Sequence, residues 1–253
     1  MSTILLPRAP TNLSTEKNNL KMTKSIKNTR DGYHLNSLYW QTYKKSLPCV
    51  SEELNEIAYG MLLGDASMYR VSHEAYMKFE QGYKQKVFVD HLFQMFQSYC
   101  FMEKPGIRFE TSQDMPRSIK SYWFKTFSHP LFSQIFEVVY QYTGKKYVKT
   151  LSEGLIRNYI TERSLAYWVM CDGSLQNNKK TLLLHSAGFS QEENTIASRE
   201  LNEKFGFKSS VIVHKKKYFV IQIPAENAVV LKKIISPYML PFFSYKIPNL
   251  GTS

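Results

Sequence analysis

The sequence predicts an α+β fold built from two similar halves, and three observations lead to this prediction. Two apolar helical segments, residues 52–64 and 161–171, each end on an Asp beside a Gly. The two aspartates, Asp65 and Asp172, lie 107 positions apart in a chain of 253 residues. The segments that follow each Asp alternate between strand-like and helical patterns in the same order. A shared layout in two halves indicates an internal repeat, and therefore a pseudo-dimer within one chain.

Each half is predicted to have the order α-β-β-α-β-β-α. The first helices begin at Ser51 and Thr161, because a hydroxyl side chain followed by Glu is typical of a helix N-terminus. The other elements follow from runs of strand-forming residues and from apolar residues at helical spacing. They are expected near residues 76–79, 84–100, 107–111, 122–126 and 130–142 in the first half, and near 181–185, 191–205, 210–213, 218–223 and 226–235 in the second.

Charge and composition indicate the class of partner. The chain carries 33 Lys and Arg against 21 Asp and Glu, a formal net charge of +12, which favours an extended polyanion such as nucleic acid. The three cysteines are far apart, which argues against a disulfide scaffold and a zinc ribbon. No apolar run approaches the 18 or so residues of a membrane span, so no membrane partner is expected.

The first 50 residues are predicted to be a basic, flexible leader outside the repeated halves. Up to residue 46 they contain eight Lys and Arg against two acids, and few apolar residues. An arm that lies on phosphates and an organellar transit peptide both fit this composition, as does a plain disordered leader. The first repeat is then expected at residues 51–150 and the second at 151–253.

The two aspartates are the candidate catalytic groups. A carboxylate at a helix C-terminus faces the negative end of the helix dipole and needs a positive partner. One such Asp is ordinary turn chemistry beside a Gly, but two at matching places favour a bound divalent cation. If the helices pack together, Asp65 and Asp172 reach one end of their interface and could hold Mg²⁺ or Mn²⁺ with waters and phosphate oxygens. That arrangement suits hydrolysis of a phosphodiester bond.

Three stretches of sequence carry a family resemblance. AYGMLLGDA and SLAYWVMCDG resemble the signature helices of the LAGLIDADG homing endonucleases, in the branch with two repeats in one chain. The C-terminal SPYMLPFFSYKIPN resembles the end of that branch. The resemblance implies a monomer whose antiparallel sheets form a saddle over a long double-stranded DNA site, with the signature helices packed at the centre.

The resemblance also implies roles for particular residues. Asp65 and Asp172 match the metal-binding catalytic carboxylates, and Lys146 and Lys246 match the lysines that flank each active site. Glu80 matches an acidic or amide residue beside the metals. Between two expected strands, Lys215, Lys216 and Lys217 form a basic turn that on such a saddle becomes a candidate for phosphate contact, although it is usually a solvated turn.

Two positions depart from the family pattern. Cys171 stands where close relatives have an Asp, and because this position is the small residue at the helix interface, we interpret Cys171 as a packing residue. Ala187 aligns with the Gln or Glu expected opposite Glu80, and Ala cannot bind metal or water. Cleavage through the second site is therefore expected to be weaker, slower or lost.

The sequence thus predicts a site-specific, metal-dependent DNA endonuclease that acts in intron mobility in a mitochondrion or chloroplast. The alternative is an RNA-binding maturase that assists intron splicing without cleaving DNA, or a structural component of a ribonucleoprotein. The intact aspartates and lysines favour cleavage, whereas Ala187 favours the alternative.

Overall fold

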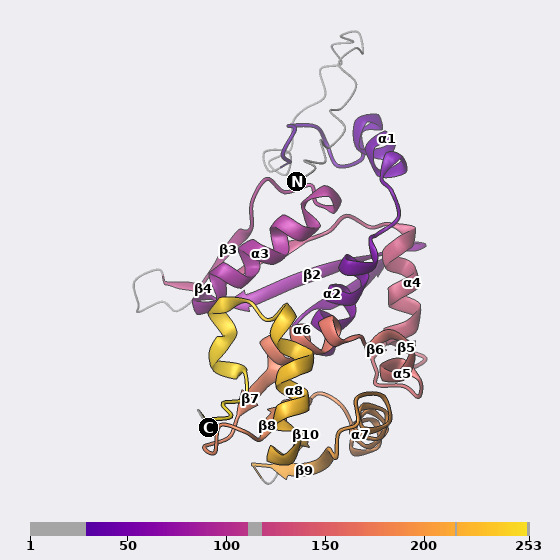
Figure 1. Ribbon diagram of the computed structural model, residues 1–253. Helices are drawn as coiled ribbons and strands as arrows, with labels where there is room; N and C mark the ends of the chain where they lie inside the picture. The colour runs from indigo at the N-terminus through magenta and orange to yellow at the C-terminus, as the bar shows by residue number, and fades with distance from the viewer. Residues whose placement is uncertain (1–28, 111–117, 216, 252–253) are drawn as a thin grey trace.

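The structure, a computed structural model, describes residues 29–110, 118–215 and 217–251. They form two halves, the first above and the second below in Figure 1. Helices α2 (Glu52–Leu63) and α6 (Glu162–Asp172) pack against each other where the halves meet. These are the two helices predicted to end on an aspartate.

The first half continues from α2 through a four-stranded sheet and two further helices. Its elements are β1 (Ser67–Val71), β2 (Glu74–Gly82), α3 (Lys86–Phe96), β3 (Gly106–Phe109), β4 (Ile119–Lys125) and α4 (Pro130–Val139). The strands are antiparallel in the order β1-β2-β4-β3. The expected helix at 84–100 is shorter than predicted, because single 3₁₀ turns flank α3 on both sides.

The second half repeats this layout. It consists of α6, β7 (Gly173–Leu175), β8 (Leu182–Leu184), α7 (Gln191–Phe205), β9 (Ser210–His214), β10 (Tyr218–Ile223) and α8 (Ala228–Ile235). Its antiparallel sheet has the matching order β7-β8-β10-β9. The predicted α+β fold with an internal αββαββα repeat is therefore confirmed.

Alternation along the strands determines which side chains face the core. In β2, every second residue from Ala75 to Gln81 is buried, and the residues between them are partly exposed on the other face of the sheet. The buried apolar side chains of both halves join in one cluster through α2 and α6, as with Met61 and Trp168. None of the helices within the described residues has the length and apolar character that a membrane span needs.

The described part of the expected leader, residues 29–50, is folded and not flexible as predicted. Helix α1 (Leu38–Ser46) buries Trp40 completely, with the Trp40 and Phe101 ring centroids 4.9 Å apart. The Arg30 guanidinium lies over the rings of Trp40 and Tyr43, at 5.1 and 4.7 Å from their centroids. An aromatic cluster therefore holds residues 29–50 against the first half, while residues 1–28 lie outside the described part of the chain.

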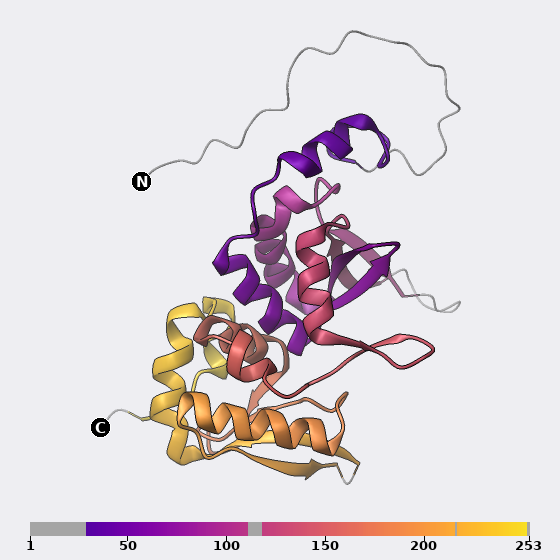
Figure 2. The ribbon, with the colours of Figure 1, turned by 90° about the vertical axis from the view of Figure 1, so that its right-hand side faces the viewer.

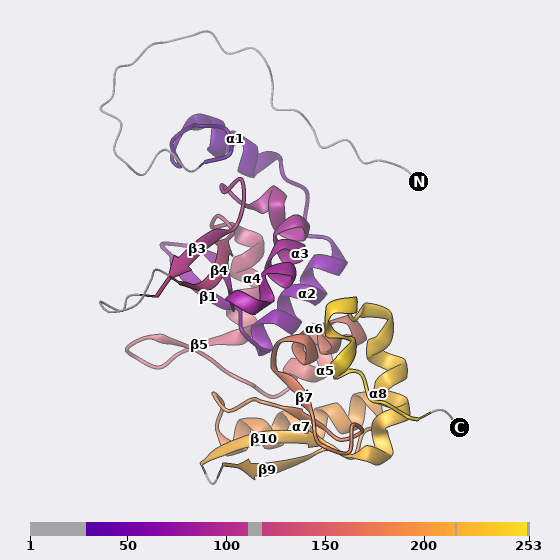
Figure 3. The same ribbon diagram turned by 90° about the vertical axis from the view of Figure 1, so that its left-hand side faces the viewer.

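The segment between the halves contains two elements that the sequence did not predict. A hairpin of β5 (Tyr140–Tyr142) and β6 (Tyr147–Lys149) leads into the short helix α5 (Leu155–Tyr159). Figures 2 and 3 show the hairpin projecting from the junction of the halves, toward the same side as the turn between β9 and β10.

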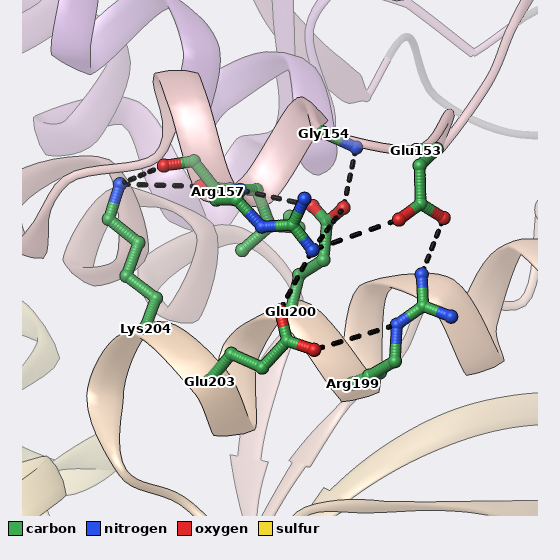
Figure 4. Close-up of polar contacts among 8 residues, drawn as sticks. Glu153, Gly154, Arg157, Arg199, Glu200, Glu203 and Lys204 are labelled. Atoms are coloured by element: carbon green, nitrogen blue, oxygen red, sulfur yellow. Dashed lines mark hydrogen bonds and ion pairs between the residues drawn. The ribbon is translucent and has the colours of Figure 1, made fainter.

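Helix α5 is attached to α7 by a polar network (Figure 4). The fully buried Glu200 carboxylate accepts hydrogen bonds from the backbone N–H groups of Gly154 and Arg157 at the start of α5. Arg157 also pairs with Glu203 at 2.8 Å. Since α6 begins soon after α5, this network fixes the entry of the second signature helix to its own half.

Candidate active site

The signature helices approach each other at backbone distance. A Cβ atom added to Gly60 would lie 2.2 Å from the Ser164 carbonyl oxygen, and one added to Gly64 would lie 2.4 Å from Cys171 Cβ. The Cys171 thiol lies 3.4 Å from the sulfur of Met61. Small residues therefore permit this contact, and Cys171 packs at the helix interface.

A Gly60→Ala substitution is expected to destabilise the protein by about 3 kcal/mol. The added Cβ would meet the backbone carbonyl of Ser164, which cannot rotate away as a side chain could, so the helices would have to separate. The free energy of unfolding in urea measures this effect. Gly188→Ala is the matched control, because an added Cβ there has no atom within 4 Å. Equal stability of the two variants would contradict the close packing of α2 on α6.

The close packing brings the two aspartates together. Asp65 follows the last turn of α2, Asp172 is the last residue of α6, and Asp172 Oδ2 lies 3.5 Å from the position of a Cβ on Gly64. Burial and the neighbouring Asp65 carboxylate raise the pKa of Asp172 to about 7. Two carboxylates at the negative ends of two helices make a site that favours a cation.

Two lysines bind the C-terminal ends of the signature helices. Lys149 Nζ donates hydrogen bonds to the carbonyl oxygens of Gly64 (3.0 Å) and Ala66 (2.8 Å). Lys246 Nζ, in a side chain only 7% exposed, donates to the carbonyl oxygens of Val169, Met170 and Cys171 at 3.2, 2.6 and 3.2 Å. Each lysine thus caps one helix beside its aspartate.

The electrostatic balance at these lysines is similar in both halves. Burial lowers the pKa of Lys149 and of Lys246, and the two aspartates oppose that change. The number of hydrogen bonds differs, however. An ammonium group has three N–H donors, so Lys246 uses all of them on the backbone, whereas Lys149 keeps one for another acceptor.

The prediction that Lys146 flanks the first aspartate is wrong by three residues. Lys146 is exposed in the turn between β5 and β6. Lys149 binds the carbonyl oxygens of the residues on either side of Asp65, and both Asp172 and Asp65 act on its charge. The sequence signal of Lys149 was present in YVKTL, but the adjacent pair Lys145 and Lys146 was the more prominent basic feature.

The prediction that Glu80 lies beside the metals is wrong by one residue. Glu80 lies on the partly exposed face of the first sheet, where its carboxylate contacts Lys78 (2.6 Å), Arg108 (3.0 Å) and Ser121 (2.7 Å). Its neighbour Gln81 points to the other face, and its Nε2 donates to Asp65 Oδ2 at 2.9 Å. Adjacent side chains of a strand face opposite sides of a sheet, so Gln81, and not Glu80, lies beside Asp65.

The placement of Ala187 opposite Glu80 is also wrong. Ser67 pairs with Lys78 in the first sheet and Ser174 with Leu183 in the second, so His185 takes the place of Glu80 and Ser186 that of Gln81. The buried Ser186 hydroxyl donates to Asn194. Within the described part of the chain, no side chain donates a hydrogen bond to the Asp172 carboxylate. The two halves of the site therefore differ, as was expected from Ala187, but the difference comes from Ser186 in the place of Gln81.

A pocket of about 210 Å³ opens at the site, lined by Lys149, Asp172 and His185 among others. His185 Nε2 and the Ser174 hydroxyl share a hydrogen bond of 2.7 Å. His185 could not be predicted from the sequence, because a lone histidine without metal-ligand spacing gives no signal. The described residues contain no group of three or more His, Cys, Asp or Glu side chains that could hold a metal ion. A cation here would therefore be held by Asp65 and Asp172, with water or substrate oxygens completing its ligands.

The predicted basic turn lies between β9 and β10. Lys215 has a positive φ of 50°, and Lys217 Nζ lies 5.2 Å from the centroid of the Tyr218 ring. Lys216 lies outside the described residues. His214, the last residue of β9, has its ring centroid 5.4 Å from that of His185, and burial together with the charges of His214, Lys246 and Lys215 lowers the pKa of His185. The start of the turn therefore lies near a residue that lines the pocket at the candidate site.

Comparison with known proteins identifies the family. The profile of the LAGLIDADG DNA endonuclease family matches residues 55–231. A probable intron-encoded endonuclease 1 from Wickerhamomyces canadensis is 31% identical over 89% of this chain and 98% of its own length. A probable intron-encoded DNA endonuclease 3 from Mycosarcoma maydis is 48% identical over 53% of this chain and 98% of its own length. The structure of the homing endonuclease I-WcaI bound to its DNA recognition sequence superposes with a TM-score of 0.76 at 30% identity, covering 85% of this chain and 95% of that one. The chain belongs to the LAGLIDADG DNA endonuclease family.

Proposed function

We propose that the protein is a divalent-metal-dependent endonuclease that cleaves both strands of a long double-stranded DNA site. The observation that carries the proposal is the pair Asp65 and Asp172 at the ends of two packed helices, each beside a helix-capping lysine. Family membership and the names of the relatives support the same activity.

Asp65 and Asp172 fit a hard divalent cation, Mg²⁺ or Mn²⁺. Both offer carboxylate oxygens, and the raised pKa of Asp172 reflects its burial and the neighbouring Asp65 charge, which a cation would offset. When bound, the metal would stabilise charge on the attacking and leaving oxygens of the phosphodiester. Gln81 would orient the Asp65 carboxylate through its amide, a contact that Asp172 lacks within the described residues.

Lys149 and Lys246 would act differently in the two halves of the site. Both hold the helix ends that carry the aspartates, and both supply positive charge near a phosphate. Lys149 has an N–H left for a phosphate oxygen or a water, whereas the N–H groups of Lys246 are all engaged. We therefore expect the two strands to be cut at different rates.

The exposed faces of the two sheets would bind the duplex. On the first sheet this face carries Tyr76, Lys78, Lys125 and Arg108. On the second it carries Ser174, His185 and Gln222, among others. Donors and acceptors on two sheets can read base edges in the major groove on both sides of the cleavage site. Because one chain supplies both halves, we propose that it acts as a monomer.

The test is cleavage of duplex DNA from the intronless copy of the host gene, in the presence of Mg²⁺ and with EDTA as a control. Relatives named as intron-encoded suggest this substrate, and with the basic, hydroxyl-rich N-terminal composition they suggest an organellar setting, mitochondrion or chloroplast. Linear product that depends on Mg²⁺ supports the proposal. Absent cleavage together with tight binding of the intron RNA would overturn it in favour of an RNA maturase.

A further inference from the structure

We propose that the β5–β6 hairpin is a DNA-contacting arm that binds phosphates beside the cleavage site through Lys145 and Lys146. The inference rests on the proposed function, since it assigns a further contact to the same substrate. It gives a role to an element that belongs to neither four-stranded sheet.

The base of the hairpin is anchored at the candidate site. Lys149, the last residue of β6, is the lysine that caps α2 beside Asp65. Tyr140, the first residue of β5, is 9% exposed, and its hydroxyl accepts a hydrogen bond from the Met68 N–H at 2.9 Å. The Tyr140 ring stacks on Phe136, with centroids 4.7 Å apart. The base of the hairpin is thus held next to the residues around Asp65.

The tip of the hairpin has a fixed conformation. Both the N–H and the hydroxyl of Thr143 donate to the Lys146 carbonyl oxygen at 3.0 Å. The Tyr142 hydroxyl donates to the Gly144 carbonyl oxygen at 2.9 Å, and Gly144 has a φ of +86°, which favours glycine. A turn closed by several hydrogen bonds has little backbone entropy left to lose on binding.

The composition of the arm suits a polyanion. Residues 138–152 include three lysines and no acid, and both Lys145 and Lys146 are exposed. Tyr142 is 61% exposed and Tyr147 40%, so two amphipathic rings flank the lysines at the tip. Exposed aromatic rings beside free lysines, with no acid to pair them, make a surface that attracts a phosphate backbone.

Position and length match a duplex held at the candidate site. The hairpin projects to the side that the turn between β9 and β10 also faces, whereas α8 lies on the opposite side (Figure 2). Lys146 and Lys149 are three positions apart, which in an extended strand is a distance of about 10 Å and corresponds to about three base pairs along the DNA axis. The arm would therefore contact the backbone a few nucleotides from a scissile phosphate.

The test is the salt dependence of duplex binding by a Lys145→Gln/Lys146→Gln variant, with the intronless host-gene duplex and no Mg²⁺. Loss of two phosphate contacts should make the slope of log K against log salt shallower by about 2, and should weaken binding of an unrelated duplex in parallel. The matched control is Lys232→Gln/Lys233→Gln at the end of α8, which removes the same charge from the opposite side.

The outcomes separate the two proposals. A shallower slope for the hairpin variant than for the α8 control, with an unchanged melting temperature, supports the arm. Equal slopes for the two variants overturn it, while leaving the endonuclease proposal in place if the wild type binds and cleaves. A wild type that binds no duplex overturns both.

Discussion

An Asp65→Asn variant is expected to lose double-strand cleavage and to keep DNA binding. Asn has the shape of Asp but lacks the charge that holds a divalent cation at the helix ends. Since a metal supplies several kcal/mol of stabilisation to the transition state, the rate should fall by a factor on the order of 10³ or more. The assay uses a supercoiled plasmid that carries the target. No cleavage, cleavage of one strand and cleavage of both strands give intact, nicked and linear plasmid, which separate on a gel.

Asp172→Asn is the companion experiment. Asp172 lacks the amide contact that Gln81 gives to Asp65, so the two variants need not leave the same amount of nicked product. Binding without metal serves as the control for folding of both variants. Linear product at the wild-type rate from either variant would contradict the assignment of that aspartate.

Lys246→Met is expected to reduce stability by about 3 kcal/mol and to abolish cleavage. The substitution keeps an unbranched side chain of similar size but leaves three carbonyl oxygens at the end of α6 without their donor. It also removes a buried cation from the neighbourhood of two carboxylates, which leaves their charge unbalanced. Urea unfolding measures the first effect, and the plasmid assay measures the second.

Two further variants make the test specific. Lys149→Met should cost less stability, because Lys149 makes two such hydrogen bonds and is less buried. Lys233→Met, at an exposed position on α8, should have little effect on either measurement. If Lys246→Met unfolds at the wild-type urea concentration, Lys246 does not hold the end of α6.

The repeated fold could be predicted because its signals are local. The bounds of α7, residues Gln191–Phe205, were predicted as the structure has them, since Ser190 forms a complete capping box and Gly206 ends the helix with a positive φ. The paired aspartates likewise follow from helix ends that can be read along the chain. Their proximity follows from Gly60 and Gly64, which are visible as small residues one helical turn apart.

The errors at the site arise from information that a single sequence does not contain. Glu80 and Gln81 are adjacent and chemically similar, and only the register of β2 determines which of them reaches Asp65. Lys149 was missed because the hairpin formed by β5 and β6 gives a weak pattern of three residues per strand. Helix α1 was missed because its stability depends on Trp40 packing against residues far along the chain, such as Phe101.

The contact of Gly60 with Ser164 and of Gly64 with Cys171 has a consequence for the products of the proposed reaction. In these contacts the backbones of the signature helices are as close as they can come, so the distance between the two aspartates is set by backbone packing. The stagger between the two cuts, and hence the length of the single-stranded ends, would then be a property of the helix interface. Substitutions on the exposed faces of the sheets could redirect the enzyme to another target sequence and would leave the shape of the broken ends unchanged.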